Sequence, residues 1–434
     1  MSLIQIIENP ARSLWKELMV RPVYRTDGLD ETVYKILTDI KSRGDQAVNE
    51  YSLQFDKVGF RDPLVSTSDM DKAEGQLDEK LKKAIIRSKQ NITVFHKNQL
   101  ITEPSIETVP GIKCWRRSVA IEKVGLYIPG GTAPLFSTML MLGVPAVLAG
   151  CEEIIICTPP QKDGAIHPAI LYSAKLMGIR KVFKVGGVQA IGAMAYGTET
   201  IPAVYKIFGP GNQYVTHAKK LIQQEGVAID MPAGPSELAV YAGNTAVPAY
   251  VAADLLSQCE HGSDSQVLLV TDSRDLAEKV NISLKQQIEK LPRKSIALRA
   301  LENSKIILMA DRETAMDYLN AYAPEHLILV CENAEEMALR VRNAGSVFIG
   351  NFAPESAGDY ASGTNHTLPT NGYAKAYSGV SIDSFVKKIS FQQLTREGLQ
   401  SISDSIIEMA TAEGLDAHAK AVEIRFKNQP PYNN

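Results

Sequence analysis

Short apolar runs alternate with amphipathic segments through the middle of the chain. From Gly125 onward, each apolar run leads into a turn rich in glycine or proline and then into a stretch with helical spacing. The runs are Ile154–Cys157, Val182–Val185 and Ile207–Phe208, then, after about residue 245, Val267–Val270, Ile306–Met309, Leu327–Val330 and Val347–Gly350. Apolar runs of this length between amphipathic helices indicate parallel sheets covered on both faces. We therefore expect an α/β protein with two successive sheet domains. The same alternation of apolar runs and helical segments in both domains suggests a duplication.

The two flanks of the chain have a helical pattern instead. An amphipathic stretch opens at Leu29, and Lys72 to Phe95 repeats the helical spacing. Neither stretch carries a chemical constellation, so we expect scaffold or dimer-embracing structure there. Residues 380–428 are again helical by pattern, with Phe391–Thr395 leading into the helices. The predicted division is a helical N-terminal extension (1–105), a first α/β domain (106–244), a second α/β domain (245–378) and a helical C-terminal tail (379–434).

One uncharged stretch, Gly125–Cys151, is long enough to be taken for a membrane span. Prolines and glycines interrupt it, so it cannot form the single apolar helix that a bilayer requires. A buried strand, a glycine turn and a buried helix explain it better.

Composition and charge narrow the function classes. The 434 residues include 46 basic and 49 acidic side chains, a net charge of -3 that gives no reason to expect a nucleic-acid or anionic-membrane partner. The five cysteines are scattered and odd in number, which favours a reducing compartment, here the cytoplasm, over a disulfide framework or a CxxC zinc module.

Candidate chemistry gathers in the second half of the chain. Gln258 and His261 stand three residues apart at an expected helix end, where both side chains could reach one ion. Glu325-His326 precedes an expected buried strand and offers a carboxylate and an imidazole for proton transfer. A loop of small residues from Pro354 to His366 carries Asp359, a hard anionic ligand. The residues alone leave open that His261 merely caps a helix, or that Glu325 ends one beside an exposed His326.

Cys259 and the glycine-containing turns are less specific signals for function. Cys259 adjoins the Gln258–His261 face without a basic neighbour to lower its thiol pKa, so we expect neither a ligand nor a nucleophile. The turns Gly130-Gly131, Gly186-Gly187 and Gly209–Asn212 lack the G-x-G-x-x-G spacing, and by pattern alone dinucleotide binding stays at even odds with a structural role.

Several longer motifs point to one family. These are Val124–Gly131 (VGLYIPGG), Ile207–Asn212 (IFGPGN), Ile229–Glu237 (IDMPAGPSE), Pro324–Leu327 (PEHL) and Glu355–Tyr360 (ESAGDY). In order and spacing they closely resemble histidinol dehydrogenase, over essentially the whole chain. The resemblance implies an α/β fold with two tandem, incomplete and duplicated Rossmann-like domains plus helical extensions at both ends. It also implies the NAD-dependent oxidation of L-histidinol to L-histidine through a bound aldehyde, the last steps of histidine biosynthesis.

The resemblance assigns the chemical residues position by position. Gln258, His261, Asp359 and His418 match zinc ligands, with one Zn²⁺ expected per subunit. Glu325 matches the residue that activates water for the second oxidation, and His326 matches the general base. No departure from the family's motifs is visible at these positions.

The resemblance also assigns binding residues and a partner. Substrate-contacting positions fall at Ser236, His366 and Glu413, together with Gln258, His261, His326, Asp359 and His418. NAD-contacting positions fall at Tyr127, Gln189 and Asn212. Glu413 and His418 are expected to come from the second subunit of a homodimer, so the C-terminal tail would complete the partner's site.

Two competing functions remain at this stage. A relative acting on another amino alcohol or diol could keep the chemical residues while its specificity changes. A non-catalytic metal-binding or assembly protein could keep the fold alone. Zinc and manganese both suit nitrogen and oxygen ligands, so the residues do not choose between them.

Overall fold

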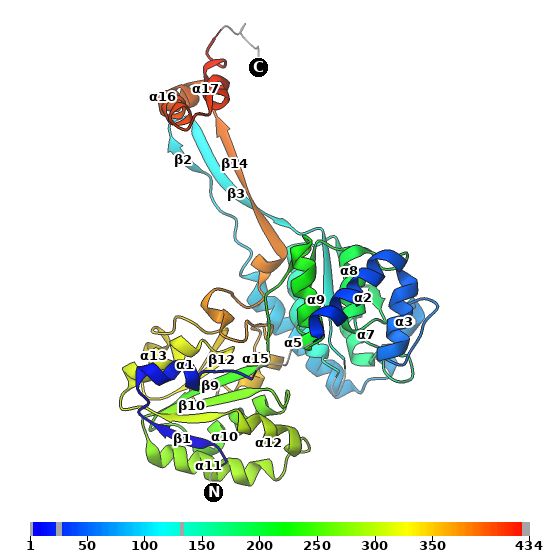
Figure 1. The fold of residues 1–434 in the computed structure, drawn as a ribbon, viewed down its shortest axis with the longest axis vertical. Helices are drawn as coiled ribbons and strands as arrows, with labels where there is room; N and C mark the ends of the chain where they lie inside the picture. Colours follow the sequence, from blue (N-terminus) through cyan, green and yellow to red (C-terminus); the bar gives the residue numbers. More distant parts are fainter. Residues whose placement is uncertain (1–2, 23–27, 131–133, 428–434) are drawn as a thin grey trace. The chain divides into compact units, whose positions relative to one another are not determined.

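The computed structural model describes residues 3–22, 28–130 and 134–427 (Figure 1). They divide into two compact units. One unit comprises Met1–Gln99 and Ile121–Phe385, and the other Leu100–Ala120 and Val386–Asn434. The larger unit contains two parallel sheets, and the apolar runs that the sequence predicts to be strands lie in them. The sheets also contain three strands that those runs did not predict: Gln5–Glu8, Ala228–Ile229 and Glu237–Ala242.

The first parallel sheet has the strand order β6–β5–β4–β7–β8. Its strands are β4 (Lys123–Tyr127), β5 (Glu153–Cys157), β6 (Lys181–Phe183), β7 (Lys206–Phe208) and β8 (Ala228–Ile229). Because strand side chains alternate between faces, Val124 and Leu126 pack into one apolar cluster and Tyr127 into the other. The strand order reverses between β4 and β7, which is where open α/β sheets usually bind ligands.

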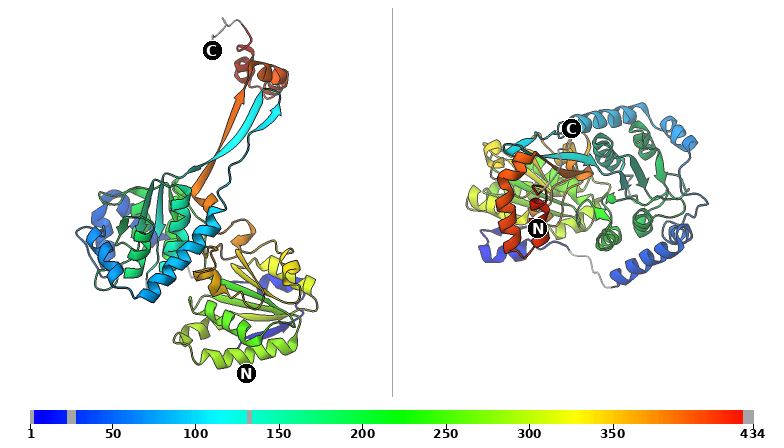
Figure 2. Two further views of the ribbon diagram at one scale, coloured as in Figure 1. Left: turned by 180° about the vertical axis from the view of Figure 1, so that it is seen from behind. Right: turned by 90° about the horizontal axis from the view of Figure 1, so that it is seen from above.

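Helices cover both faces of this sheet, as the views of Figures 1 and 2 show. One face packs against α4 (Thr67–Gly75), α5 (Glu79–Lys97), α6 (Phe136–Ala149) and α7 (Pro168–Leu176). The other face packs against α2 (Leu29–Arg43), α3 (Asp45–Phe55), α8 (Gly187–Tyr196) and α9 (Gln213–Gln224). Local capping helps to start them: the Asp78 side chain accepts the Leu81 N–H at the start of α5, and the Asn212 side chain caps α9.

The second parallel sheet has the strand order β1–β11–β10–β9–β12–β13. Its strands are β1 (Gln5–Glu8), β9 (Glu237–Ala242), β10 (Gln266–Thr271), β11 (Lys305–Leu308), β12 (His326–Val330) and β13 (Ser346–Ile349). One face is covered by α10 (Pro248–Cys259), α11 (Arg274–Ile288) and α12 (Lys294–Glu302). The other is covered by α1 (Trp15–Leu18), α13 (Arg312–Tyr322) and α14 (Ala334–Ala338). Short connecting elements are η1 (Arg12–Leu14), η2 (Tyr373–Lys375), η3 (Ile382–Phe385) and α15 (Glu355–Tyr360).

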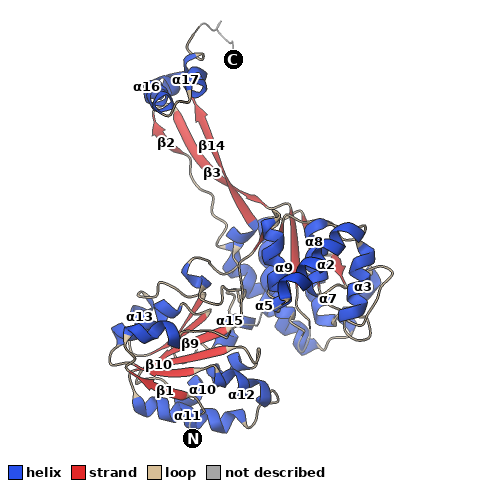
Figure 3. Cartoon of the chain, viewed as in Figure 1, coloured by secondary structure: helices blue, strands red, loops and turns tan. Residues whose placement is uncertain are grey.

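The smaller unit is a three-stranded antiparallel sheet with two helices (Figure 3). It consists of β2 (Ile106–Val109), β3 (Ile112–Ala120), β14 (Val386–Leu394), α16 (Arg396–Ala412) and α17 (Asp416–Glu423). The helical pattern expected from residue 380 is therefore wrong over Val386–Leu394, where β14 pairs along its whole length with β3. Phe391 stacks on Trp115 across this pair, with ring centroids 5.5 Å apart, so the strand depends on a partner distant in sequence.

The structure confirms some of the expected elements and contradicts others. The expected α/β class with parallel sheets covered on both faces is confirmed. Gly125–Cys151 contains the end of β4 and then α6, as expected, and in the described part of the chain no helix is long and apolar enough to span a membrane. Gly131 lies outside the described residues. The expected loop from Pro354 to His366 is wrong in its first half, because Glu355–Tyr360 forms α15.

Candidate active site

A cavity of about 290 Å³ in the larger unit brings together residues from the ends of both parallel sheets. The first sheet contributes residues that follow the carboxyl ends of β4 and β7, whereas the second contributes residues at the amino ends of β9, β10 and β12. The lining includes Pro129, Thr138, Gly211, Asn212, Ser236, His261, Ser265, Glu325, His326, Asp359 and His366. Seven predicted site residues therefore line one cavity: Asn212, Ser236, His261, Glu325, His326, Asp359 and His366.

Glu325 and His326 are buried residues that line this cavity. Glu325 ends the turn after α13 and His326 begins β12, and their side chains are only 7% and 5% exposed. His326 Nδ1 lies 3.7 Å from Glu325 Oε2 and 3.7 Å from Glu355 Oε1, while its Nε2 lies 3.5 Å from Asp359 Oδ1. One imidazole thus stands among three carboxylates.

A second group of polar atoms lies beside this imidazole. Gln258, in the last turn of α10, is fully buried, and neither atom of its amide has a hydrogen-bond partner among the described residues. His261 follows the helix; its side chain is 47% exposed and its Nε2 lies 4.0 Å from Asp359 Oδ2. Ligand atoms of His261, Glu355 and Asp359 all lie within 4.8 Å of one another. Buried polar atoms without partners are costly, so this group has the character of a cation site.

The charges of these groups shift one another strongly. Burial raises the pKa of Glu325 to about 7 and that of Glu355 to about 8, in each case against the opposing effect of the nearby His326. Burial lowers the pKa of His326, but Glu325, Glu355 and Asp359 outweigh it and raise the pKa to about 10. The pKa of Asp359 is lowered despite burial, because the imidazole of His326 lies 3.5 Å from its Oδ1 and favours the charged carboxylate. The carboxylates outnumber the cations here, which again favours a bound metal ion.

His366 closes the cavity from the side of the first sheet. Its Nδ1 lies 2.9 Å from the carbonyl oxygen of Asp359, and its Nε2 lies 3.0 Å from Thr138 Oγ1 at the start of α6. Burial lowers the pKa of His366, which favours the neutral imidazole. A neutral ring in this position can exchange hydrogen bonds with a polar ligand.

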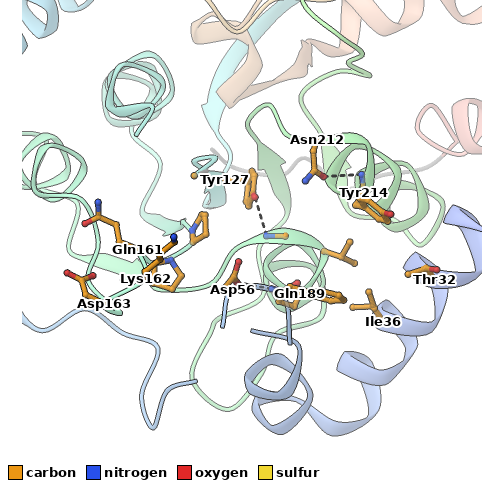
Figure 4. A pocket seen from close by; sticks show the side chains of 16 residues that line it. Thr32, Ile36, Asp56, Tyr127, Gln161, Lys162, Asp163, Gln189, Asn212 and Tyr214 are labelled. Atoms are coloured by element: carbon orange, nitrogen blue, oxygen red, sulfur yellow. Dashed lines mark hydrogen bonds between the residues drawn. The ribbon is translucent and has the colours of Figure 1, made fainter. Parts of the chain in front are cut away.

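A larger cavity of about 1020 Å³ adjoins the first sheet (Figure 4). The three predicted NAD-contacting residues line it: Tyr127, Gln189 and Asn212. Gly187 donates its backbone N–H to the Tyr127 hydroxyl at 3.1 Å, and Gln189 Nε2 donates to Asp56 Oδ2 at 3.2 Å. The Gln189 side-chain oxygen is buried and has no hydrogen-bond partner among the described residues. Asn212 lines both this cavity and the smaller one.

Two predicted site residues belong to the smaller unit. Glu413 follows α16 and His418 lies in α17, and both are exposed. The cavities of the larger unit are lined without them, so their part in the site stays a prediction.

The structure also adds polar residues that the sequence did not single out. Glu355 stands four residues before Asp359 on α15, so both carboxylates share a helix face; this spacing is a usable signal once the segment is taken as a helix. Asp56, at the end of α3, lines the larger cavity together with Thr32 and Ile36 of α2, so these helices are more than scaffold. No local motif marks Asp56.

Comparisons with known proteins agree along the whole chain. A family model described as histidinol dehydrogenase matches residues 19–426. Histidinol dehydrogenase of Bacteroides thetaiotaomicron is 57% identical over 424 residues, covering 98% of this chain and 99% of the relative. That of Escherichia coli K12 is 46% identical over 413 residues, covering 94% of each chain.

A solved structure gives the same result in three dimensions. The crystal structure of histidinol dehydrogenase from Elizabethkingia anophelis matches with a TM-score of 0.97 and 52% identity, covering 98% of this chain and 99% of the other. Agreement of this extent in sequence and fold shows that the chain belongs to the histidinol dehydrogenase family.

Proposed function

We propose that this protein oxidises L-histidinol to L-histidine in two successive hydride transfers to NAD, through L-histidinal that stays bound, as the last steps of histidine biosynthesis. The observation that carries the proposal is the pairing of Glu325 and His326 in a cavity that shares Asn212 with a dinucleotide-sized one. A reacting carbon in the smaller cavity can therefore meet a nicotinamide that enters from the larger one.

Zinc is the metal we propose for the site, with Gln258, His261 and Asp359 as ligands and His418 supplied by a second subunit. The partnerless amide of Gln258 and the partnerless Oδ1 of Asp359 support a cation at this place. Imidazole, amide and carboxylate ligands suit Zn²⁺ and leave it net positive charge. When bound, the ion polarises the substrate and fixes its amine and imidazole nitrogens.

The protein's own groups then divide the proton transfers. In the first oxidation His326 accepts the hydroxyl proton while hydride leaves the carbinol carbon for nicotinamide. The imidazole must be neutral for this step, and a cation beside the carboxylates that raise its pKa would favour the neutral form. Glu325 next takes a proton from water as the water oxygen adds to the aldehyde carbon, and His326 returns the proton it holds to the aldehyde oxygen, which gives the neutral hydrate. In the second oxidation His326 accepts a hydroxyl proton of the hydrate, and a second NAD accepts the hydride. Ser236, His366 and Glu413 are the further substrate contacts we propose.

Tyr127, Gln189 and Asn212 are the NAD contacts we propose. Their place in the cavity of about 1020 Å³ supports this, because a cavity of that size accommodates a large part of a dinucleotide. The Gly209–Asn212 turn lets backbone approach the coenzyme without a G-x-G-x-x-G motif.

We further propose a cytoplasmic homodimer. The five cysteines, all in described segments, are free thiols, which supports a reducing compartment. Glu413 and His418 are exposed in the smaller unit, where a second chain could use them.

The proposal is tested with purified protein, L-histidinol and NAD. We expect two NADH for each histidine formed, and loss of activity on chelation with recovery on adding Zn²⁺. A yield of one NADH per substrate consumed contradicts retention of the aldehyde. A panel of other amino alcohols and diols, measured by kcat/KM, tests whether histidinol is the preferred substrate.

A further inference from the structure

The backbone of Glu237 touches both residues of the proposed catalytic pair. Glu237 is the first residue of β9, next to β12, and its side chain is only 2% exposed. Its backbone N–H donates to Glu325 Oε2 at 2.9 Å, and its carbonyl oxygen lies 3.3 Å from His326 Nδ1. A shift of this one peptide segment therefore moves the contacts of both side chains.

The side chain of Glu237 is held by a residue from the beginning of the chain. Arg21 donates through Nε to Glu237 Oε1 and through Nη2 to Oε2, the second at 2.9 Å. The backbone N–H of Asn371 donates to Oε1 at 2.6 Å. Arg21 is 12% exposed in its side chain, so this forked ion pair is shielded from water.

Arg21 also holds the turn that leads to Glu325. Its Nη2 donates to the carbonyl oxygen of Tyr322 at 2.6 Å, and its guanidinium lies over the Tyr322 ring, 4.0 Å from the centroid. The next residue, Ala323, is fully buried and has φ 55° and ψ 67°, the left-handed region that a residue with a Cβ seldom adopts. Such a conformation persists only where the surroundings fix it. Pro324 and Glu325 follow directly.

We infer that Arg21 and Glu237 are positioning residues for catalysis: their buried ion pair fixes the start of β9 and the turn before β12, and thereby aims Glu325 and His326. Neither residue lines the substrate cavity, so their effect is transmitted through the pair. The inference rests on the proposed function, because it assigns its consequence to the proton transfers of Glu325 and His326.

The test uses the full-length protein with Arg21→Ala, Arg21→Lys and Glu237→Gln. Lysine keeps the charge but loses the fork, and glutamine keeps the acceptor but loses the charge. We expect kcat for histidinol to fall about tenfold or more in Arg21→Ala, with KM changed by less than about threefold, because positioning acts on the chemical step. Arg21→Lys should recover part of the loss, and Glu237→Gln should lie between Arg21→Ala and the unchanged protein.

Arg12→Ala is the matched control. Arg12 comes from the same N-terminal segment and pairs with Asp317. Its side chain is 68% exposed, and we propose no role for it in binding or catalysis. We expect unchanged kcat and KM for this variant. Zinc content and thermal unfolding are measured for every variant, so that a loss of metal or of fold is recognised. If Arg21→Ala does not fold, the kcat and KM values of Arg21→Lys and Glu237→Gln test the inference.

The inference is overturned if folded, zinc-loaded variants at both positions keep kcat within about twofold of the unchanged protein, or if only KM rises. A crystal structure of Arg21→Lys provides a readout that needs no turnover. We expect the contact of 2.9 Å between Glu237 N and Glu325 Oε2 to lengthen, and an unchanged contact contradicts the inference. Failure of the unchanged protein to oxidise histidinol would instead contradict the proposed function, and the structural readout would still stand.

Discussion

Glu325 and His326 are adjacent in the chain and both contact the backbone of Glu237, but their other surroundings differ. Glu325 accepts a backbone N–H from Glu237, whereas His326 is surrounded by carboxylates. A carboxyl group whose pKa is raised to about 7 by burial is a better base for water than an ordinary one. Two residues side by side can therefore serve two different steps.

Glu325→Gln separates these steps. Glutamine keeps an oxygen that can accept from Glu237 but cannot take a proton from water. We expect the first NADH to form at a rate near that of the unchanged protein, and the second to slow about a hundredfold or more, the typical contribution of a general base. Rapid-mixing measurements of NADH with chemical trapping of the aldehyde check this. His326→Ala serves as the control that slows both steps, and equal slowing of both steps by Glu325→Gln contradicts the division.

Asp254 supplies a pH-dependent effect on stability. Burial raises its pKa to about 7 in the folded protein, from 3.8 when unfolded. The folded state thus binds the proton more tightly, so ionisation destabilises the protein increasingly from about pH 4 and fully above about pH 7. We expect Asp254→Asn to raise Tm at pH 8 by about 2 °C, a modest value since water screens this half-buried group. Thermal unfolding at pH 4.5 should show almost no gain, and an equal gain at both pH values contradicts the assignment.

At the scale of elements, the two parallel sheets contribute opposite ends to the site. The first sheet contributes the turns after β4 and β7, at the reversal of strand order, as is usual for α/β sheets. The second contributes the amino ends of β9, β10 and β12, which that rule does not anticipate. Lys219 holds the Gly209–Asn212 turn in place, because it donates to the Gly209 carbonyl oxygen at 2.8 Å and also pairs with the buried Asp230.

Gly209→Ala tests the turn after β7. Gly209 has φ 124°, and a Cβ there would lie 2.0 Å from the Tyr127 carbonyl oxygen. Both the backbone and its close approach exclude a side chain, so we expect KM for NAD to rise about tenfold and stability to fall by about 1–3 kcal/mol. Gly226→Ala is the control: Gly226 has φ 98° but open space around it. That variant should lose stability while keeping KM for NAD, and a normal KM in Gly209→Ala contradicts the proposed coenzyme site.

The sequence predicts elements well where the pattern is local. The runs at Ile154, Leu327 and their equivalents are buried parallel strands because their residues are apolar on both faces. The antiparallel β14 escaped prediction because most of its residues are exposed and its partner β3 is about 270 residues away. Arg21 and Asp56 escaped for the same reason: each is an ordinary charged residue until the fold brings it to its partner. Motif resemblance recovered the candidate site, which periodicity could not.

At the scale of the whole molecule, the residues predicted for the site belong to two different units of the chain. Gln258, His261 and Asp359 lie in the larger unit and Glu413 and His418 in the smaller. An exposed apolar set in the smaller unit, Ile106, Met409, Leu415 and Ile424, is consistent with association through this part of the chain.

Mixing two inactive variants tests whether the smaller unit serves a partner. Co-expressed His326→Ala and His418→Ala chains pair at random. If the tail completes the other subunit's site, each mixed dimer has one site without any substitution, so activity should recover to about a quarter of the unchanged level. If each tail serves its own chain, every site carries a substitution and the mixture stays inactive. Each variant expressed alone is the control.

The two cavities meet at Asn212, the one described residue that lines both. A reaction that removes two hydrides from one carbon chain needs two fresh coenzymes in turn, yet only one reactive aldehyde. Under the proposed function, NADH can leave the larger cavity and a second NAD can enter it while the aldehyde stays in the smaller cavity. Two cavities that share one residue would then let the proposed enzyme exchange its coenzyme without releasing an aldehyde that reacts with amines elsewhere in the cell.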